Sequence, residues 1–228
     1  MEETAHIIKV ETSRRGTAQE KEADSYVAID LETTGLDPKH DKIIEIGAVL
    51  VIDGEIKETF STFVNPRREL DGRIRELTGI TGEMTAGAPD IGDVIGRVVE
   101  FCRDLPLLGH HIIFDYSFLK RAAVNKGLVF EKSGIDTLTL CRRFMPEEEK
   151  KNLENASRYY GIKQTDAHRA LADALTAHLL YRNVKRSHFS SAPEAFRCKP
   201  VVYKVKKEQP ASKKQKEVLR ELLKYHRI

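Results

Sequence analysis

The sequence predicts an α/β fold in which helices flank a mixed sheet, and two observations carry the prediction. Three apolar segments with strand character follow one another closely between residues 26 and 64. Beyond residue 90, apolar residues recur at helical spacing, and one short apolar run interrupts them. Closely linked strands are typical of antiparallel pairing, and strands that alternate with helices are typical of a layered sheet with parallel strands.

The three expected strands are bounded by turn residues. The first covers Val27–Glu32 and the second Ile43–Ile52. Asp53-Gly54 then supplies a hairpin turn, so that the third strand, Glu55–Val64, pairs antiparallel with the second. Asn65-Pro66 ends that strand because proline has no backbone N–H to donate.

The rest of the domain is expected to be mainly helical. Apolar residues at helical spacing cover Ile91–Cys102, and Leu105–His110 has the character of a short buried strand. Gly127 ends a helix over Asp115–Lys126. The remaining expected helices are Leu138–Phe144, Leu153–Tyr160 and Arg169–Val184.

Composition and charge divide the chain into three parts. Residues 1–24 form a polar N-terminal extension with a strand-like piece at Ile7–Val10, residues 25–190 form the domain, and residues 191–228 form a basic tail. From Phe196 onward, eleven Lys and Arg face three acids, which gives this part +8 and leaves −5 for the rest of a chain whose net charge is +3. A basic tail on an acidic body is typical of proteins with a polyanionic partner.

The tail also carries a predicted helix. Ser212 and Gln215 fit a capping box, and an apolar stripe follows it, formed by Val218, Leu219, Leu222 and Leu223. We expect this stripe to pack on the body and leave a charged outer face. The alternative is a helix that binds nucleic acid or a protein partner.

Apolar run lengths, the charge of the N-terminus and the cysteine spacing indicate where the protein is expected to reside. No apolar run approaches the ~18 residues of a membrane span, and the first fifteen residues are too charged for a secretory signal. The three cysteines, Cys102, Cys141 and Cys198, fit neither a zinc site nor a disulfide framework. We therefore expect a cytoplasmic protein with reduced thiols.

The most informative feature is a pair of carboxylates at the end of the first strand. Asp30 and Glu32 are two residues apart in a strand, so their side chains share one face. Neighbouring carboxylates repel one another, and burial adds to the cost. A divalent metal held between them explains the pair most simply.

Two more acids and a histidine complete a candidate site. Taken alone, Asp115 fits a helix N-cap, and a histidine five residues before Asp173 carries little information. Taken together, four acids on three separated segments match the ligands that two metal ions need to promote phosphoryl transfer. His168 is suited to accept the proton of the attacking water, because the unperturbed pKa of histidine is ~6.5.

These motifs resemble a known superfamily. Asp-x-Glu-Thr-Thr-Gly at 30–35, His-x-x-x-Phe-Asp at 110–115 and His-x-x-x-x-Asp at 168–173 are similar, in this order, to the DEDD exonucleases. The similarity spans Tyr26 to Val184 and is to the DnaQ-like branch, which includes the proofreading exonuclease of bacterial DNA polymerase III. Histidine at 168 matches the DEDDh subgroup. The resemblance implies an RNase H-like sheet, with three antiparallel strands followed by parallel ones.

The resemblance also implies roles for the matched positions. Asp30, Glu32, Asp115 and Asp173 would bind two Mg²⁺ or Mn²⁺ ions, and His168 would be the general base. The implied substrate-binding residues are Thr33, Thr34, Gly35, Leu36, His110, His111 and Phe114, of which His110 and Phe114 would support the second motif. His111 departs from the family, where asparagine often follows the histidine.

The sequence therefore favours a 3′→5′ exonuclease that acts on 3′ ends of nucleic acid, with DNA as the preferred substrate and RNA as the alternative. A DNA polymerase is a candidate partner. Two other hypotheses remain: a catalytically silent module that binds nucleic acid or a polymerase, and a set of structural carboxylates paired with Arg or Lys.

Overall fold

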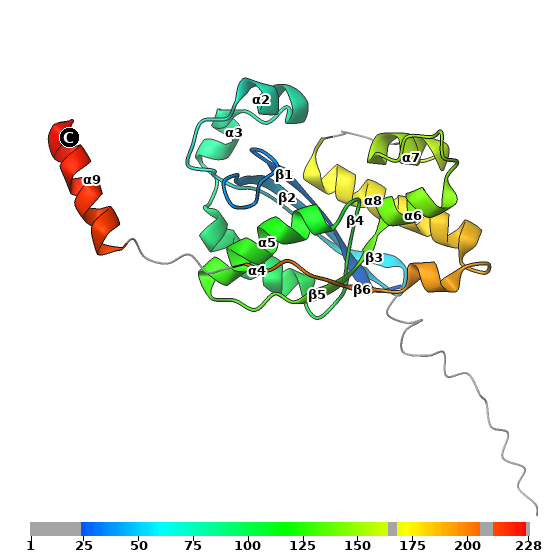
Figure 1. Cartoon of the computed structure of the whole chain (residues 1–228). Coiled ribbons are helices and arrows are strands. Elements are labelled where there is room, and N and C mark those ends of the chain that lie inside the picture. The colour runs from blue at the N-terminus through cyan, green and yellow to red at the C-terminus, as the bar shows by residue number, and fades with distance from the viewer. Residues whose placement is uncertain (1–23, 164–167, 206–211, 227–228) are drawn as a thin grey trace, which may run out of the picture.

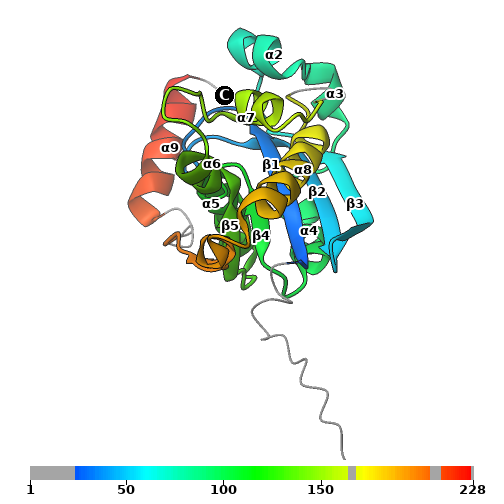
Figure 2. The same cartoon turned by 90° about the vertical axis from the view of Figure 1, so that its right-hand side faces the viewer.

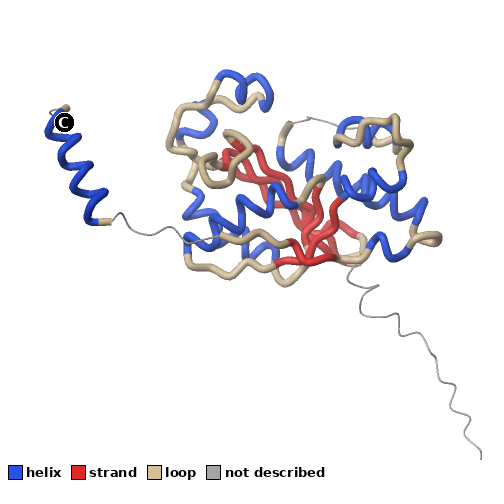
Figure 3. Tube along the Cα trace, viewed as in Figure 1, coloured by secondary structure: helices blue, strands red, loops and turns tan. Residues whose placement is uncertain are grey.

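The computed structural model describes residues 24–163, 168–205 and 212–226 of the chain (Figure 1). The strand-like piece at Ile7–Val10 lies outside these residues. One sheet runs through the middle of the domain, and helices lie on both sides of it (Figure 3).

The sheet has six strands in the order β3-β2-β1-β4-β5-β6. β1, β2 and β3 are antiparallel, and β4 and β5 continue the sheet in parallel with β1. This arrangement confirms the predicted fold class, and the Asp53-Gly54 turn joins β2 to β3 as expected. The strands are β1 Tyr26–Thr33, β2 Ile43–Ile52, β3 Glu55–Phe63, β4 Leu107–Gly109, β5 Lys132–Asp136 and β6 Lys199–Val201.

Two strands were not predicted, because their own residues carry little strand signal. β5 reads Lys-Ser-Gly-Ile-Asp and owes its conformation to pairing with β4. β6 pairs antiparallel with β5 at the edge of the sheet, where Pro200 is tolerated because no further strand needs its N–H. The sheet thus continues past the domain boundary predicted at residue 190.

The helices cover the two faces of the sheet (Figures 1 and 2). α4 and α5 pack against one face, and α6, α7 and α8 against the other. The short helices α2 and α3, which were not predicted, accompany a small cluster of Ile44, Leu70 and Ile80. The helices are α2 Gly72–Thr78, α3 Gly82–Ala86, α4 Ile91–Cys102, α5 Ile113–Lys126, α6 Thr137–Phe144, α7 Leu153–Tyr159 and α8 Ala170–His188, followed by the 3₁₀ turn η1 Pro193–Phe196.

Strand alternation in β1 decides where the candidate carboxylates point. Val27, Ile29 and Leu31 belong to the core under α4 and α5. Tyr26 and Ala28 belong to the core under α8. Asp30 and Glu32 continue this second series, so they lie on the face that α8 covers.

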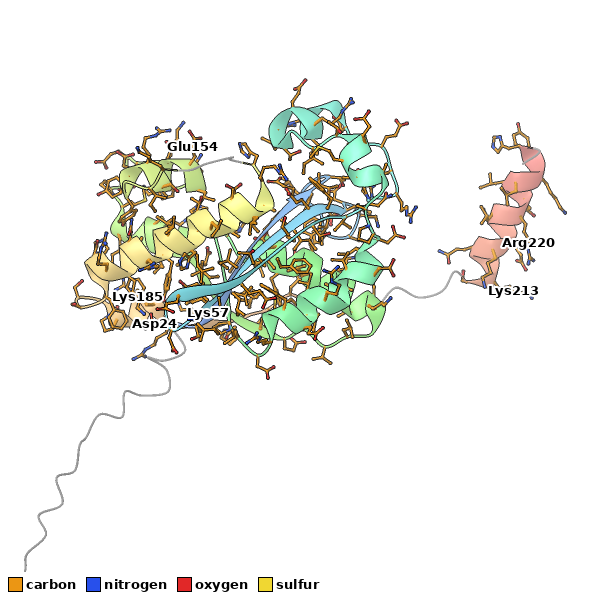
Figure 4. The ribbon with its side chains drawn as sticks, turned by 180° about the vertical axis from the view of Figure 1, so that it is seen from behind. Asp24, Lys57, Glu154, Lys185, Lys213 and Arg220 are labelled. Atoms are coloured by element: carbon orange, nitrogen blue, oxygen red, sulfur yellow. The ribbon has the colours of Figure 1, made fainter. Side chains whose placement is uncertain are left out.

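The tail helix α9, Lys213–Tyr225, forms with the predicted capping box of Ser212 and Gln215. The expectation that its apolar stripe packs on the body was wrong. No residue of α9 is buried, and the helix stands apart from the domain (Figure 1), with Lys213 and Arg220 remote from the sheet (Figure 4). Within the described ranges, no helix has the length and apolar character needed to cross a bilayer.

A buried histidine makes the stability of this fold depend on pH. His178 on α8 is 1% exposed, and its Nδ1 lies 3.0 Å from the hydroxyl oxygen of Tyr26 on β1. Burial, assisted by Arg182, lowers the pKa of His178 to about 4. The unfolded chain protonates this histidine near pH ~6.5. Its stabilising contribution is therefore complete above that pH and is lost as the pH falls toward 4.

We expect His178→Asn to keep the contact with Tyr26 and to remove this titration. The difference in free energy of unfolding between wild type and variant should change by up to about 3 kcal/mol between pH 7 and pH 4. Urea unfolding at several pH values measures the free energy of unfolding of both proteins. Groups that titrate alike in the two proteins cancel when one free energy is subtracted from the other. Parallel pH profiles would contradict the prediction.

Candidate active site

The candidate site lies at the end of β1 that extends beyond β4. Within β1, only Val27 and Ala28 pair with β4, so the later residues of β1 have no β4 partner. Asp115, which is 3% exposed, fills this position: its Oδ1 accepts a hydrogen bond of 3.0 Å from the N–H of Leu31. α5 begins at Ile113, so Asp115 lies in its first turn, not at the N-cap.

The first turn of α8 brings the third motif to the same place. Asp173 lies in this turn and is 8% exposed. His168 has a φ of +64°, and its N–H donates to Asp173 Oδ2 at 3.1 Å. Donor atoms of Glu32, His168 and Asp173 all lie within 4.8 Å of one another. The structure thus brings together Glu32 and the two residues of the third motif, which are far apart in the sequence.

Burial and mutual repulsion together disfavour the ionised forms of the carboxylates in this cluster. Burial first, and then the charges of Asp115, Asp173 and Glu32, raise the pKa of Asp30 well above its usual value. Burial, and then Asp173 and Glu45, raise the pKa of Glu32 to about 7. Burial likewise raises the pKa of Asp115 to about 8, against hydrogen bonds that lower it. Like charges in such an arrangement favour a bound cation.

The donor set fits hard divalent ions. Carboxylate oxygens are the ligands that Mg²⁺ and Mn²⁺ prefer, and four of the five groups are carboxylates. Within the described part of the chain, neither Asp30 nor Glu32 forms an ion pair with Lys or Arg. The hypothesis of structural pairing in the core therefore has no support at these two positions.

The loop after β1 is held by its own polar groups. Thr33 Oγ1 donates to the carbonyl of Gly35, and Thr34 Oγ1 accepts from the N–H of Lys42. At Gly35, an added Cβ would lie 2.4 Å from Asp41 Oδ2, so a larger residue would displace the Asp41 side chain. Leu36, four residues after Glu32, is 83% exposed.

The second motif has a mainly structural environment. His110 Nε2 lies 2.7 Å from the carbonyl oxygen of Lys151, and burial lowers the pKa of this histidine. Phe114 packs against Phe118, with ring centroids 5.1 Å apart. His111 is exposed with a φ of +76°, which asparagine also tolerates, so its backbone conformation accounts for both residues at this position.

Two features of the site were missed at the sequence level. Glu45 on β2 is 1% exposed and lies directly opposite Glu32 in the ladder, and Arg169 binds it. Asp136, at the end of β5, accepts from the N–H of His111. For Glu45, the sequence does carry a signal, because it is a single acid within the apolar run Ile43–Ile52.

Comparison with known families gives an extended match. The model of the RNase_T family, described as exonuclease, matches residues 27–181. Among curated proteins, the chain is 40% identical over 164 residues to a PolC-type DNA polymerase III of Clostridium perfringens, and 43% identical over 168 residues to that of Bacillus subtilis. Each alignment covers 72% of this chain but only 11% and 12% of the relative, so the chain spans a small part of these polymerases.

Solved structures show the same fold. Exonuclease X, in complex with 5′ overhanging duplex DNA, is 26% identical with a TM-score of 0.59, and the match covers 74% of this chain and 96% of that one. E. coli exonuclease I in complex with a dT13 oligonucleotide has a TM-score of 0.64 at 18% identity, over 76% of this chain and 42% of that one. The second likeness concerns the fold alone.

Removing one charge from the cluster should stabilise the metal-free protein. We expect Asp30→Asn to raise the free energy of unfolding in EDTA at pH 8 by about 1 kcal/mol, because it relieves repulsion. Millimolar Mn²⁺ should raise the Tm of wild type more than that of the variant. Thermal unfolding with and without Mn²⁺ measures both effects.

Asp53→Asn is the matched control, because it makes the same chemical change at the far end of β2, in a turn whose φ of +52° suits asparagine. Its response to Mn²⁺ should equal that of wild type. A metal-free Asp30→Asn protein less stable than wild type would show that Asp30 is a structural carboxylate.

Proposed function

The chain belongs to the RNase_T family of exonucleases, which hydrolyse phosphodiester bonds, and we propose that it is a metal-dependent 3′→5′ exonuclease that removes nucleotides from DNA ends. One observation carries the proposal: Asp30, Glu32, Asp115, His168 and Asp173 belong to one cluster built on β1, α5 and α8. A silent binding module would have no need for a cluster whose charges repel one another.

DNA is proposed as the substrate because of the relatives. The matched segment is part of proteins named DNA polymerase III, and Exonuclease X was solved with duplex DNA. A DNA polymerase is a proposed partner on the same ground. RNA remains the alternative substrate that the experiment below distinguishes.

The four acids are proposed to hold two Mg²⁺ or Mn²⁺ ions. Asp30 and Glu32 present their carboxylates from one face of β1, and Asp115 and Asp173 present theirs from the first turns of α5 and α8. When bound, such ions supply an activated water and stabilise the leaving 3′ oxygen of the penultimate nucleotide.

His168 is proposed as the general base. Its side chain is exposed at the edge of the cluster, where a ring nitrogen can accept the proton of the attacking water. The hydrogen bond from its N–H to Asp173 holds its backbone against a metal-binding helix turn.

The loop after β1 is proposed to bind the terminal nucleotide. Thr33, Thr34 and Gly35 fix the loop, and the exposed Leu36 side chain offers an apolar surface to a base. His110 and Phe114 are proposed to support the second motif, and His111, exposed beside it, to touch the substrate strand.

The proposal predicts hydrolysis from the 3′ end. A 5′-labelled single strand, incubated with the protein and Mg²⁺ or Mn²⁺, should give a ladder that shortens with time, with DNA degraded faster than RNA of the same sequence. Asp30→Asn should reduce the rate at least about 100-fold, since it removes a carboxylate from the metal site. A sequencing gel measures all three rates.

Asp53→Asn again serves as the control and should degrade the strand at the rate of wild type. A ladder that survives EDTA, or an Asp30→Asn protein as active as wild type, would refute the proposed site. Folded wild-type protein that binds the strands without cleaving them would favour the silent module.

The basic tail is proposed to add affinity for single strands without taking part in cleavage. Deletion should begin at Lys206, because Phe196 is 1% exposed and β6 is part of the sheet. Loss of residues 206–228 should weaken DNA binding and make log Kd less dependent on log salt, since each neutralised phosphate contributes a slope of ~0.7 on a single strand. Fluorescence anisotropy between 50 and 300 mM NaCl measures the slope, and an unchanged slope would exclude the tail from binding.

A further inference from the structure

Glu45 is a charged residue in β2, a strand whose residues are all buried except Ile52. Its side chain is 2% exposed, and it lies on β2 with Gly47 and Val49 on the face that α8 covers. A buried carboxylate needs partners for both oxygens. Its partners come from the start of α8.

Arg169 supplies one set of partners. Its Nη2 lies 2.9 Å from Glu45 Oε1, and its Nε lies 3.2 Å from each carboxylate oxygen. The guanidinium carbon also lies 5.3 Å from the ring centroid of Phe63 on β3. We refer to this pairing of Glu45 with Arg169 as the Glu45–Arg169 fork. Planar pairing of this kind fixes direction as well as distance.

The same carboxylate also caps a helix. Arg169 is the N-cap residue of α8, yet its side chain makes no capping hydrogen bond. Glu45 Oε2 instead accepts from the N–H of Ala170 at 3.2 Å, so a residue 125 positions earlier satisfies the helix end. A carboxylate at this end also interacts favourably with the helix dipole.

The backbone at the start of α8 packs directly against the backbone of β2. A Cβ at Gly47 would lie 2.1 Å from the nitrogen of Leu171 and 2.2 Å from the carbonyl carbon of Ala170. The helix start therefore rests on the backbone of β2 at Gly47, and the Glu45–Arg169 fork fixes it one pleat along the strand.

The position of the fork connects it to the chemistry. Arg169 directly follows His168, and Asp173 lies one helical turn further on. His168 itself has a strained φ of +64°. The fork thus immobilises the chain between the histidine and a carboxylate of the cluster, while Glu45, with both oxygens engaged, is not in a position to act as a further ligand.

We propose that Glu45 and Arg169 are positioning residues of the exonuclease reaction: their fork holds His168 and the first turn of α8 in register with Glu32. This inference rests on the proposed function. It assigns a role that neither the motifs nor the acidic cluster contains, since neither residue touches the reacting atoms.

The test compares Arg169→Ala, Arg169→Lys and Glu45→Gln with wild type in steady-state hydrolysis of single-stranded DNA. Arg169→Ala should lower kcat by about 10- to 100-fold with KM within about 2-fold, because small displacements of a reacting group cost rate and not binding. Arg169→Lys keeps the charge and loses the planar fork, so kcat should fall by a similar factor. Glu45→Gln should do likewise, because an NH2 group, which cannot accept a hydrogen bond, replaces one of the two oxygens and the charge opposite Arg169 is lost.

Chemical rescue separates positioning from folding. The Arg169 side chain is 43% exposed, so its removal opens a slot above Glu45 that small cations can enter. Millimolar methylguanidinium should restore kcat of Arg169→Ala at least several-fold, and methylammonium at the same concentration should not. Arg143→Ala is the control, because it breaks an exposed Arg–Glu pair between α6 and η1 and should behave as wild type.

A second readout does not require activity. Hydrogen exchange of amides 168–173 in the metal-free protein should accelerate in Arg169→Ala and Glu45→Gln, with exchange in β1 and α5 unchanged. Wild-type kcat in both variants, or exchange that accelerates throughout the domain, would overturn the proposal. An inactive wild type with the local exchange effect would refute the proposed function and leave the fork as a structural element of α8.

Discussion

Repulsion among carboxylates is the constraint on which the architecture depends. Asp30, Glu32, Asp115 and Asp173 gather at one end of β1, and Glu45 lies directly across the ladder from Glu32. Three of these acids have a compensation within the protein. Asp115 and Asp173 lie in the first turns of α5 and α8, where the helix dipole favours negative charge. Glu45 has its own arginine. Asp30 and Glu32 form no ion pair within the described residues, although the charge of Arg169 acts favourably on Glu32, and their pKa values stay raised.

The geometry of the sheet brings these carboxylates together at the end of β1. β4 ends at Gly109, so the end of β1 has no strand partner on that side. There the N–H of Leu31 donates to the side chain of Asp115. On the face of the sheet, Gly47 lets α8 approach until its first turn meets β2. A side chain at position 47 would move Asp173 away from Glu32. The glycine is therefore as important to the cluster as the acids are.

The sequence predicted most of what is local and periodic. Strand alternation placed Asp30 and Glu32 on one face, and the turn and capping residues gave the hairpin and the α9 cap. It did not predict β5 and β6, because residues such as Lys132 and Pro200 become strand only beside β4 and β5. Nor did it predict the Glu45–Arg169 fork. A buried acid signals that a partner exists, but only the tertiary structure identifies one 124 residues away.

The prediction that α9 packs on the body was wrong for a related reason. An amphipathic pattern shows that a helix has an apolar face but not what covers it.

Two histidines show how the site accommodates strain. His111 and His168 both have positive φ, a conformation that costs a non-glycine residue about 1 kcal/mol or more. Each has the same compensation: the N–H of His111 donates to Asp136, the N-cap of α6, and the N–H of His168 donates to Asp173 in α8. A hydrogen bond to a charged acceptor contributes about 1.5–3 kcal/mol, enough to offset the strain. Both positive-φ conformations thus depend on acids at helix starts, so that changing either acid would release a histidine as well as remove a charge.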